Sequence, residues 1–172
     1  MPDGDAIEFG APWSARLRSS SLISVLILAA IFVSGIVSWS RTGWLINLVL
    51  LGLPLIIIAA TAFTTVRGYT LTSTAIRVRR LGWETHLPIA GLLSVTGNDE
   101  ALQRSIRLFG NGGLFAFTGE FWSRQLGRYR ALATDPSRAV VLRYAKRRIV
   151  ITPHDPQKFI VQARTLLQNR GA

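Results

Sequence analysis

Two long apolar stretches lie close together near the start of the chain. Residues 21–39 and residues 43–63 contain no charged side chain. At about 1.5 Å per residue, a helix of either length crosses a hydrocarbon core of about 30 Å. Only Ser40-Arg41-Thr42 separates them, and Trp39 and Trp44 flank this link, where indole rings favour the headgroup zone. The pattern predicts a hairpin of two antiparallel transmembrane helices.

The interior of these two spans is almost free of polar side chains. Asn47 is their single amide, whereas a transport path or an intramembrane enzyme needs charged or several polar groups. Pro54 predicts a tolerated kink, and either Gly35 with Ser38 or Ser34 with Ser38 permits a close approach of the two helices. The acidic residues ahead of the first span, and the second span directly after it, argue against a cleaved signal peptide. We therefore expect a membrane anchor.

After Val66 the pattern changes to short runs with a period of two. Apolar and basic residues alternate in Ile76-Arg77-Val78-Arg79, and residues 140–144 alternate likewise. The run Ile149-Val150-Ile151 predicts a strand that is covered on both faces. Turn-forming residues separate these runs, which is typical of an antiparallel barrel or sandwich. The turn segments are 72–74, 97–99, 111–113, 135–137 and 145–147.

The end of the chain has a helical pattern. Asp155 can cap a helix, because its carboxylate can accept from the free N–H groups of the first turn, and Pro156 suits the first helical position. One apolar stripe follows, formed by Phe159, Ile160, Ala163, Leu166 and Leu167. Gly171 ends the pattern. We expect an amphipathic helix that closes one end of a small barrel.

The basic residues are concentrated after the apolar stretches. Residues 67–172 contain 17 Lys or Arg and 6 Asp or Glu, and so carry the whole net charge of +11. Anionic lipid is the nearest partner for a basic domain beside a bilayer, and ordinary solvated faces of an Arg-rich chain are the alternative. Nucleic acid is not expected, because the aromatic residues that would stack on bases lie mostly away from the basic clusters. The absence of cysteine excludes disulfides and thiolate metal sites.

The distribution of charge also predicts an orientation. Arg16 and Arg18 precede the first span and a dense basic region follows the second, whereas the turn holds only Arg41. The positive-inside rule then places both termini in the cytoplasm, at the plasma (inner) membrane. The predicted organisation is a cytoplasmic N-terminal segment 1–20, the transmembrane hairpin 21–64, a cytoplasmic domain 66–168 and a tail 169–172.

Several segments of the predicted domain occur in an order that resembles a known family. They are Tyr69-Thr70-Leu71-Thr72, Ile76-Arg77-Val78-Arg79-Arg80, Leu87-Pro88-Ile89, Leu92-Leu93-Ser94-Val95, Gly112-Gly113, Leu126-Gly127-Arg128-Tyr129 with Ala133-Thr134-Asp135, and Ile149-Val150-Ile151-Thr152-Pro153 with Asp155-Pro156 and Phe159. The order is similar to that of the bacterial pleckstrin-homology-like (PH) domain membrane proteins. The resemblance implies a membrane-anchored α+β protein with a seven-stranded, strongly bent antiparallel sheet or barrel, a C-terminal capping helix and no known catalytic chemistry.

The same resemblance directs attention to the basic residues. Eukaryotic PH relatives that bind phosphoinositides use basic residues of the first hairpin, where this chain has Arg67, Arg77, Arg79 and Arg80. Arg77 and Arg79 would share one strand face and could engage one phosphate. The uncharged Thr72-Ser73-Thr74 turn favours non-specific contact with anionic lipid over a specific headgroup site. A second basic cluster, Lys146-Arg147-Arg148, falls at a predicted hairpin tip, as a contact site or as a solvated turn.

Aromatic residues gather in the middle of the domain. They include Phe109, Phe115, Phe117, Phe121 and Trp122, and around Phe115 both strand faces are apolar. One face can belong to the core, which leaves the other for a protein partner, the bilayer or another copy of the chain. The glycine-rich residues 108–113 lack the Gly-Lys-Ser/Thr ending of a phosphate loop and are expected to form a hairpin turn.

The remaining polar residues do not form a recognisable catalytic constellation. The acids are scattered, and His86 with Glu84 is expected to be a surface pair on one strand. No enzyme activity, metal or cofactor is therefore expected. The leading hypothesis is a non-enzymatic binding or scaffold module that mediates protein–protein interaction or self-association at the membrane. The alternative is a sensor of anionic lipid headgroups that uses the basic strand surface.

Overall fold

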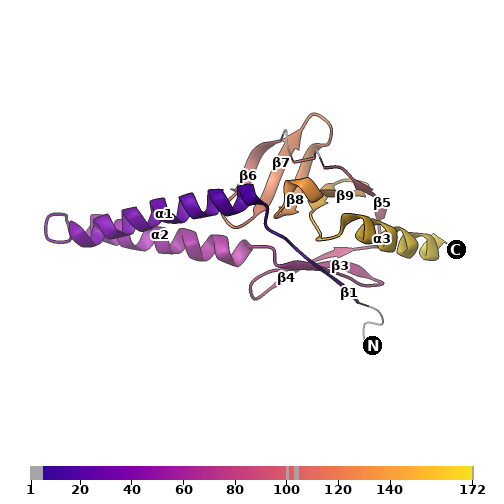
Figure 1. The fold of residues 1–172 in the computed structure, drawn as a ribbon, viewed down its shortest axis with the longest axis horizontal. Helices are drawn as coiled ribbons and strands as arrows, with labels where there is room; N and C mark the ends of the chain where they lie inside the picture. The colour runs from indigo at the N-terminus through magenta and orange to yellow at the C-terminus, as the bar shows by residue number, and fades with distance from the viewer. Residues whose placement is uncertain (1–5, 100, 103–104, 172) are drawn as a thin grey trace.

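The structure is a computed structural model that describes residues 6–99, 101–102 and 105–171 (Figure 1). Residues 1–5 of the predicted N-terminal segment and residue 172 of the predicted tail lie outside the described residues. Two long helices, α1 (Ala15–Val37) and α2 (Trp44–Thr64), form an antiparallel hairpin that projects from a β-rich domain.

The two helices are long and apolar enough to cross a membrane. Each has a mean hydropathy of 2.5 over its most apolar stretch, and only 11% of that stretch is buried. A core helix of a water-soluble domain would bury most of such a surface. Helix α1 begins at Ala15, ahead of the predicted Ser21, because Ser14 caps it: the Ser14 side chain accepts a hydrogen bond from the Leu17 N–H at 3.1 Å.

Small and polar residues shape the hairpin. A Cβ added at Gly35 would lie 2.8 Å from the Cβ of Leu50, so glycine permits the close approach of α1 and α2. Asn47, buried at the far end, serves the turn: its side-chain amide donates to the carbonyls of Trp39 (3.1 Å) and Thr42 (3.3 Å). The side-chain amide of Asn47, the single amide side chain of the two spans, therefore stabilises the turn between α1 and α2.

The strands form two sheets. The four-stranded sheet has the order β1 (Ile7–Gly10), β2 (Gly68–Leu71), β3 (Ala75–Arg79), β4 (Glu84–Pro88). The six-stranded sheet has the order β5 (Leu92–Gly97), β9 (Val140–Tyr144), β10 (Arg148–Ile151), β8 (Gly127–Ala133), β7 (Phe117–Ser123), β6 (Ile106–Gly112). A short 3₁₀ helix, η1 (Pro136–Arg138), links β8 to β9.

Two features of the predicted sheet need correction. The described residues contain ten strands and not seven, in part because β1 comes from the N-terminal segment and pairs with β2. The sheet is also not wholly antiparallel, because β10 pairs in parallel with β8. Strand β10 returns from β9 as a hairpin and enters between β9 and β8, which gives it the same direction as β8.

The main core lies between the two sheets and the C-terminal helix α3 (Pro156–Gly171). The rings of Phe9 (β1) and Phe159 (α3) meet edge-to-face with centroids 5.1 Å apart. The expected cap is present, since the Asp155 carboxylate accepts from the Lys158 N–H at 3.0 Å. Helix α3 continues through the residues predicted as a tail.

The Ile149-Val150-Ile151 strand is covered on both faces, as predicted. Ile149 and Ile151 belong to the main core, whereas Val150 belongs to a second apolar cluster with Phe121 and Tyr129 on the outer side of the six-stranded sheet. This second cluster explains why both faces of the central strands are apolar in the sequence.

Candidate functional site

The C-terminal end of α2 is held by the turn between β3 and β4. The indole Nε1 of Trp83 donates to the Phe63 carbonyl at 2.9 Å, and Nη1 of Arg80 donates to the Thr64 carbonyl at 2.9 Å. These carbonyls are among those that a helix leaves without a partner at its end. The Arg80 guanidinium also lies over the Trp83 ring, 4.4 Å from its centroid. We call this end of α2, with the residues that contact it, the helix root.

The beginning of α1 is fixed to the same domain by the loop between β6 and β7. The Ser20 hydroxyl donates to the Gly113 carbonyl at 2.7 Å, and the Phe115 N–H donates to the Ser21 hydroxyl at 2.9 Å. The Ser14 N–H donates to the Thr134 carbonyl at 3.4 Å, beside the end of β8. Both helices are therefore tied by hydrogen bonds to the β domain.

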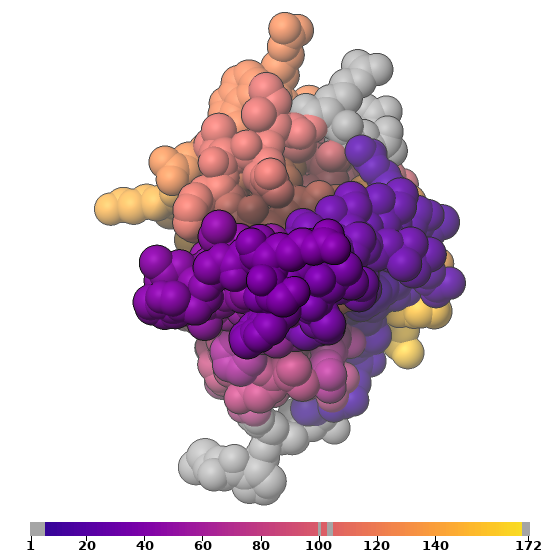
Figure 2. Space-filling model, turned by 90° about the vertical axis from the view of Figure 1, so that its left-hand side faces the viewer, coloured from indigo at the N-terminus to yellow at the C-terminus, as the bar shows by residue number. Residues whose placement is uncertain are grey.

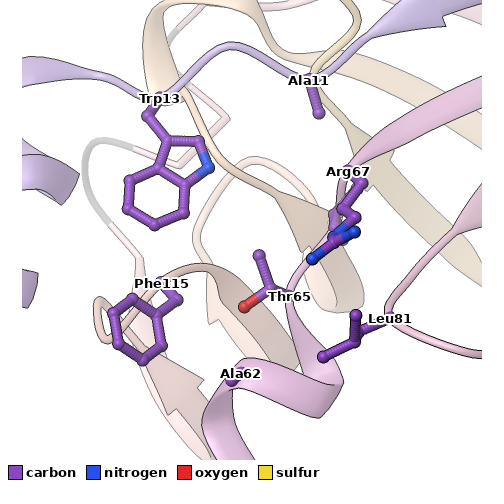
Figure 3. Close-up of a pocket in the computed structure, with 8 residues that line it drawn as sticks. Ala11, Trp13, Ala62, Thr65, Arg67, Leu81 and Phe115 are labelled. Carbon is purple, nitrogen blue, oxygen red and sulfur yellow. The ribbon is translucent and has the colours of Figure 1, made fainter.

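A pocket of about 390 Å³ opens beside the helix root (Figure 3). Its lining residues are Ala11, Trp13, Ala62, Thr65, Val66, Arg67, Leu81 and Phe115. Trp13 and Phe115 lie together with ring centroids 6.0 Å apart, and Arg67 extends its guanidinium from the opposite side (Figure 3). An apolar wall with one cation is suited to an amphiphile that carries a negative group. We call it the Arg67 pocket.

The first predicted basic group is divided by the fold. Arg67 is exposed and lines the Arg67 pocket, and Arg77 and Arg79 alternate with buried residues on β3, as a one-sided strand requires. Arg79 forms an ion pair with Glu8 of β1 at 2.8 Å. Arg80 is only 8% exposed and is bound to the end of α2, so it does not lie on the predicted open basic surface.

The second predicted basic group, Lys146-Arg147-Arg148, lies at the tip of the β9–β10 hairpin, which we call the hairpin tip. The Arg147 guanidinium lies 5.0 Å from the centroid of the Tyr144 ring, and Arg148 donates to the Leu126 carbonyl. A polar pocket of about 260 Å³ there is lined by Arg128 and Arg143 as well. Arg128 lies near the start of β8, whereas Thr134, directly after its end, accepts from the Ser14 N–H at the cap of α1, so about 20 Å of strand separates the hairpin tip from α1.

The predicted aromatic surface is also divided. Phe109 is 80% exposed and Trp122 is 40% exposed, whereas Phe115 and Phe117 are half-buried. Phe121 is buried in the second apolar cluster with its ring stacked on Tyr129, so the prediction that it belongs to a partner surface is wrong. The sequence could not separate these residues, because both faces of β7 are apolar.

Part of this region lies beside the end of α2, because Phe109 lines a pocket together with Thr64. Strand β6, which carries Phe109, is the member of its sheet nearest to the helix hairpin, and β5 is the farthest (Figure 1). Figure 2 looks at the molecule from the hairpin end and shows the β6–β7 region on one side of the helices and the β3–β4 region on the other. We call this side of the domain the helix-side face.

Burial changes the acid–base behaviour of two residues near the helix root. The pKa of Arg80 is lowered to about 10, chiefly by burial and then by the positive charge of Arg130 on β8, against the raising effect of Tyr69. Burial raises the pKa of the Tyr69 hydroxyl to about 12, although hydrogen bonds with Thr152 oppose this shift. Tyr69 donates to the Leu132 carbonyl at 2.6 Å and thereby joins the two sheets.

The structure shows no constellation that suggests catalysis among the described residues. His86 and Glu84 lie 3.9 Å apart on the exposed side of β4, as the surface pair that their spacing predicts. No group of three or more potential metal ligands occurs in the part of the chain that the structure describes. Most of the glycine-rich segment 108–113 lies in β6, so the predicted turn is displaced: residues 113–116 connect β6 to β7, and the Asn111 side chain accepts from the N–H groups of Gly113 and Leu114.

Sequence reasoning missed three residues near the ends of the two helices. Trp83 contacts the helix root, Ser21 fixes the start of α1 to the β6–β7 loop, and Arg130 lines a pocket beside the helix root. Trp83 lies in the short β3–β4 turn, where an indole is unusual and could have marked a docking residue. Nothing in the sequence singles out Arg130, because it is one of several arginines at alternate positions of predicted strands.

Comparison with known proteins agrees with this architecture. A family model described as Bacterial PH domain matches residues 67–167, which is more than half of the chain. The chain belongs to the bacterial PH domain family. The match begins directly after α2 and ends within α3, so β1 and the two long helices lie outside the matched PH domain. Domains of this family are generally non-catalytic binding modules. No curated protein and no solved structure matched the chain.

Proposed function

We propose that this chain is a non-enzymatic PH module that α1 and α2 anchor in the plasma membrane and whose helix-side face binds lipid of the same membrane. The observation that carries the proposal is that exposed apolar residues of the PH domain share one side with the two apolar helices. Leu81, Trp83 and Phe109 line pockets beside the end of α2, and exposed Ile106 and Leu108 continue β6, the strand nearest the helices (Figure 1).

The topology supports an anchor with both of its ends on one side of the bilayer. Strand β1 immediately precedes α1, strand β2 immediately follows α2, and the two strands pair with each other. Two spans that start and finish at neighbouring strands must cross and return. Arg16 and Arg18 lie near this end and only Arg41 lies in the turn, which favours a cytoplasmic location for the domain and both termini.

The helix-side face has the composition of a surface that lies in the headgroup zone. If the helices cross the bilayer, β6 and the β3–β4 turn lie at the membrane surface beside them. Transfer of their apolar area from water is favourable by roughly 25 cal/mol per Å². Indole rings such as that of Trp83 favour this depth. The Arg67 pocket opens at the same level and offers an apolar wall and one cation to a lipid.

Site-directed labelling tests the proposal directly. The chain has no cysteine, so Ile106→Cys and Leu93→Cys each provide one attachment point for a spin label in the full chain, reconstituted in vesicles. The two positions are matched, with 62% and 61% exposure, but Ile106 lies on β6 and Leu93 on β5, at opposite edges of one sheet. We expect lipid-soluble relaxation agents to reach the label at residue 106 far more than the label at residue 93. Equal accessibility of the two labels to these agents would overturn the proposal.

A second candidate function is binding of a protein partner or of a second copy through β6. Strand β6 is an edge strand, so one row of its backbone groups is available for pairing, and Phe109 beside it is 80% exposed. Crosslinking in native membranes, followed by mass spectrometry, distinguishes the two occupants. Reproducible crosslinks from β6 to one protein, or to the chain itself, would support this function, and crosslinks to lipid alone would exclude it.

A further inference from the structure

A second pocket lies at the helix root, distinct from the Arg67 pocket. It has a volume of about 390 Å³ and lies between the end of α2, the β3–β4 turn and the strands β6, β7 and β8. Its polar and aromatic lining includes Thr64, Arg80, Trp83, Phe109, Glu120 and Arg130. None of the residues that line the Arg67 pocket lines this one.

The Arg80 guanidinium in this pocket has more N–H donors than the surrounding protein has acceptors for them. Its side chain is buried, Nη1 donates to Thr64 and the guanidinium lies over the Trp83 ring. Its Nε, however, is buried without a hydrogen-bond partner among the described residues. A buried donor without an acceptor costs free energy, and a buried cation without a counter-charge costs more. The site therefore favours an acceptor that carries negative charge.

Arg130 adds a second positive charge to the same pocket. It lies on the same face of β8 as Leu132, which belongs to the core between the two sheets. Its charge is close enough to Arg80 to oppose the protonated form of that guanidinium. An anion between the two residues would convert this repulsion into two attractive contacts.

The acidic residue of the pocket is bonded to a different arginine. Glu120 lines the pocket and lies directly across the β7–β8 ladder from Arg130, but its carboxylate accepts from Nε of Arg128 at 2.9 Å. Arg128 lies toward the hairpin tip, where it also lines the polar pocket of that region. Among the described residues, Arg130 has no ion pair with an acid.

We propose that this pocket holds the phosphate of one anionic phospholipid between Arg80 and Arg130, with the lipid chains leaving past Phe109 and Trp83 into the bilayer. The proposal rests on the membrane anchoring in the proposed function. A lipid fits better than a free phosphate because the pocket includes Thr64, the last residue of α2, and an exposed aromatic rim. Guanidinium groups bind phosphate through charge-assisted hydrogen bonds in a fixed geometry.

Native mass spectrometry of the full chain released from detergent micelles tests the site. Phosphatidylglycerol is the anionic probe, phosphatidylcholine is the neutral lipid control, and inorganic phosphate is the soluble anion. We expect one phosphatidylglycerol to remain bound per chain, in preference to phosphatidylcholine. The Arg130→Gln variant should weaken this binding by about tenfold, since it removes one charged donor. Arg130 is exposed, so the variant should fold.

The matched control is Arg143→Gln, which changes an exposed strand arginine of the hairpin tip pocket. If Arg143→Gln weakens phosphatidylglycerol binding as much as Arg130→Gln does, the proposed site is wrong. Inorganic phosphate that displaces the lipid at equal concentration would overturn the assignment to a lipid. The label at residue 106 separates the two proposals. Suppose that the label contacts lipid in the Arg130→Gln variant and that this variant binds phosphatidylglycerol as well as the parent chain does. Only this inference then fails. If the label contacts no lipid in the parent chain, the proposed function fails.

Discussion

The helix root and the hairpin tip are both rich in arginine, but their arginines have different surroundings. At the hairpin tip, Lys146 and Arg147 follow one another in the sequence and remain exposed. At the helix root, Arg67, Arg80 and Arg130 come from distant positions and line pockets beside the end of α2. A run of basic residues is conspicuous in a sequence, yet the fold can leave it in water. Arg80, a buried cation whose Nε has no hydrogen-bond partner among the described residues, is the better candidate for binding.

The difference has a simple energetic origin. Water solvates the charges at the hairpin tip, so these side chains need no partner and a contact there contributes little. Arg80 is largely removed from water, and its pKa is lowered for that reason. A ligand that supplies negative charge at the helix root would replace solvation that the protein has already lost. Three substitutions test whether the helix root is also the structurally important region.

The largest effect is expected for Trp83→Ala. This change removes the hydrogen bond to Phe63, the stacking on the Phe63 ring and the support under Arg80. We expect a loss of about 3 kcal/mol of stability, near the lower end of values for large-to-small aromatic substitutions. Thermal unfolding of the full chain in detergent measures it. Trp122→Ala is the control, because Trp122 is 40% exposed and Trp83 is 37% exposed. Equal losses in the two variants would contradict a special role for the β3–β4 turn.

An intermediate effect is expected for Ser21→Ala. The substitution removes the acceptor of the Phe115 N–H and thereby loosens the β6–β7 loop from α1. Loss of one such partner costs roughly 1 kcal/mol. Hydrogen exchange of the residue 115 amide should become several-fold faster. Ser19→Ala is the control, since the Ser19 hydroxyl donates only to the Ala15 carbonyl of its own helix. Unchanged exchange in Ser21→Ala would show that the loop does not depend on this bond.

The smallest effect is expected for Arg147→Gln at the hairpin tip. The residue is exposed and its described contact is the Tyr144 ring. We expect a change in stability within about 0.5 kcal/mol. Phosphatidylglycerol retention should equal that of the parent chain. A tenfold loss of lipid here would reverse the ranking of the two regions and make the hairpin tip the lipid site.

The sequence predicts those parts of the fold that local chemistry determines. The two apolar stretches predict the helices, because about 20 consecutive apolar residues are typical of a membrane-spanning helix and of few other structures. Asp155 and Pro156 predict the start of α3 through capping, which is also local. The alternation in Ile76–Arg79 predicts β3 and its buried face. In each case the signal and the structure lie in the same short segment.

The parts that the sequence does not predict depend on pairing between distant segments. Strand β1 is only four residues long, too short for its alternation to predict a strand, and its partner β2 follows after both helices. The entry of β10 between β9 and β8 depends on the packing of three strands at once. The approach of Arg130 to Arg80 follows from that packing. A site built by such convergence has no sequence motif of its own.

The pairing of β1 with β2 also sets an order for biosynthesis. Residues 7–10 leave the ribosome before either helix, but their partner, residues 68–71, emerges only after both helices have been made. The first strand must therefore wait while the hairpin enters the bilayer, and it completes its sheet only if the second helix has brought the chain back to the same side. Correct insertion thus becomes a precondition for closing the core around Phe9, and a chain that inserted only once would be left with an unfinished domain that quality-control proteases can recognise.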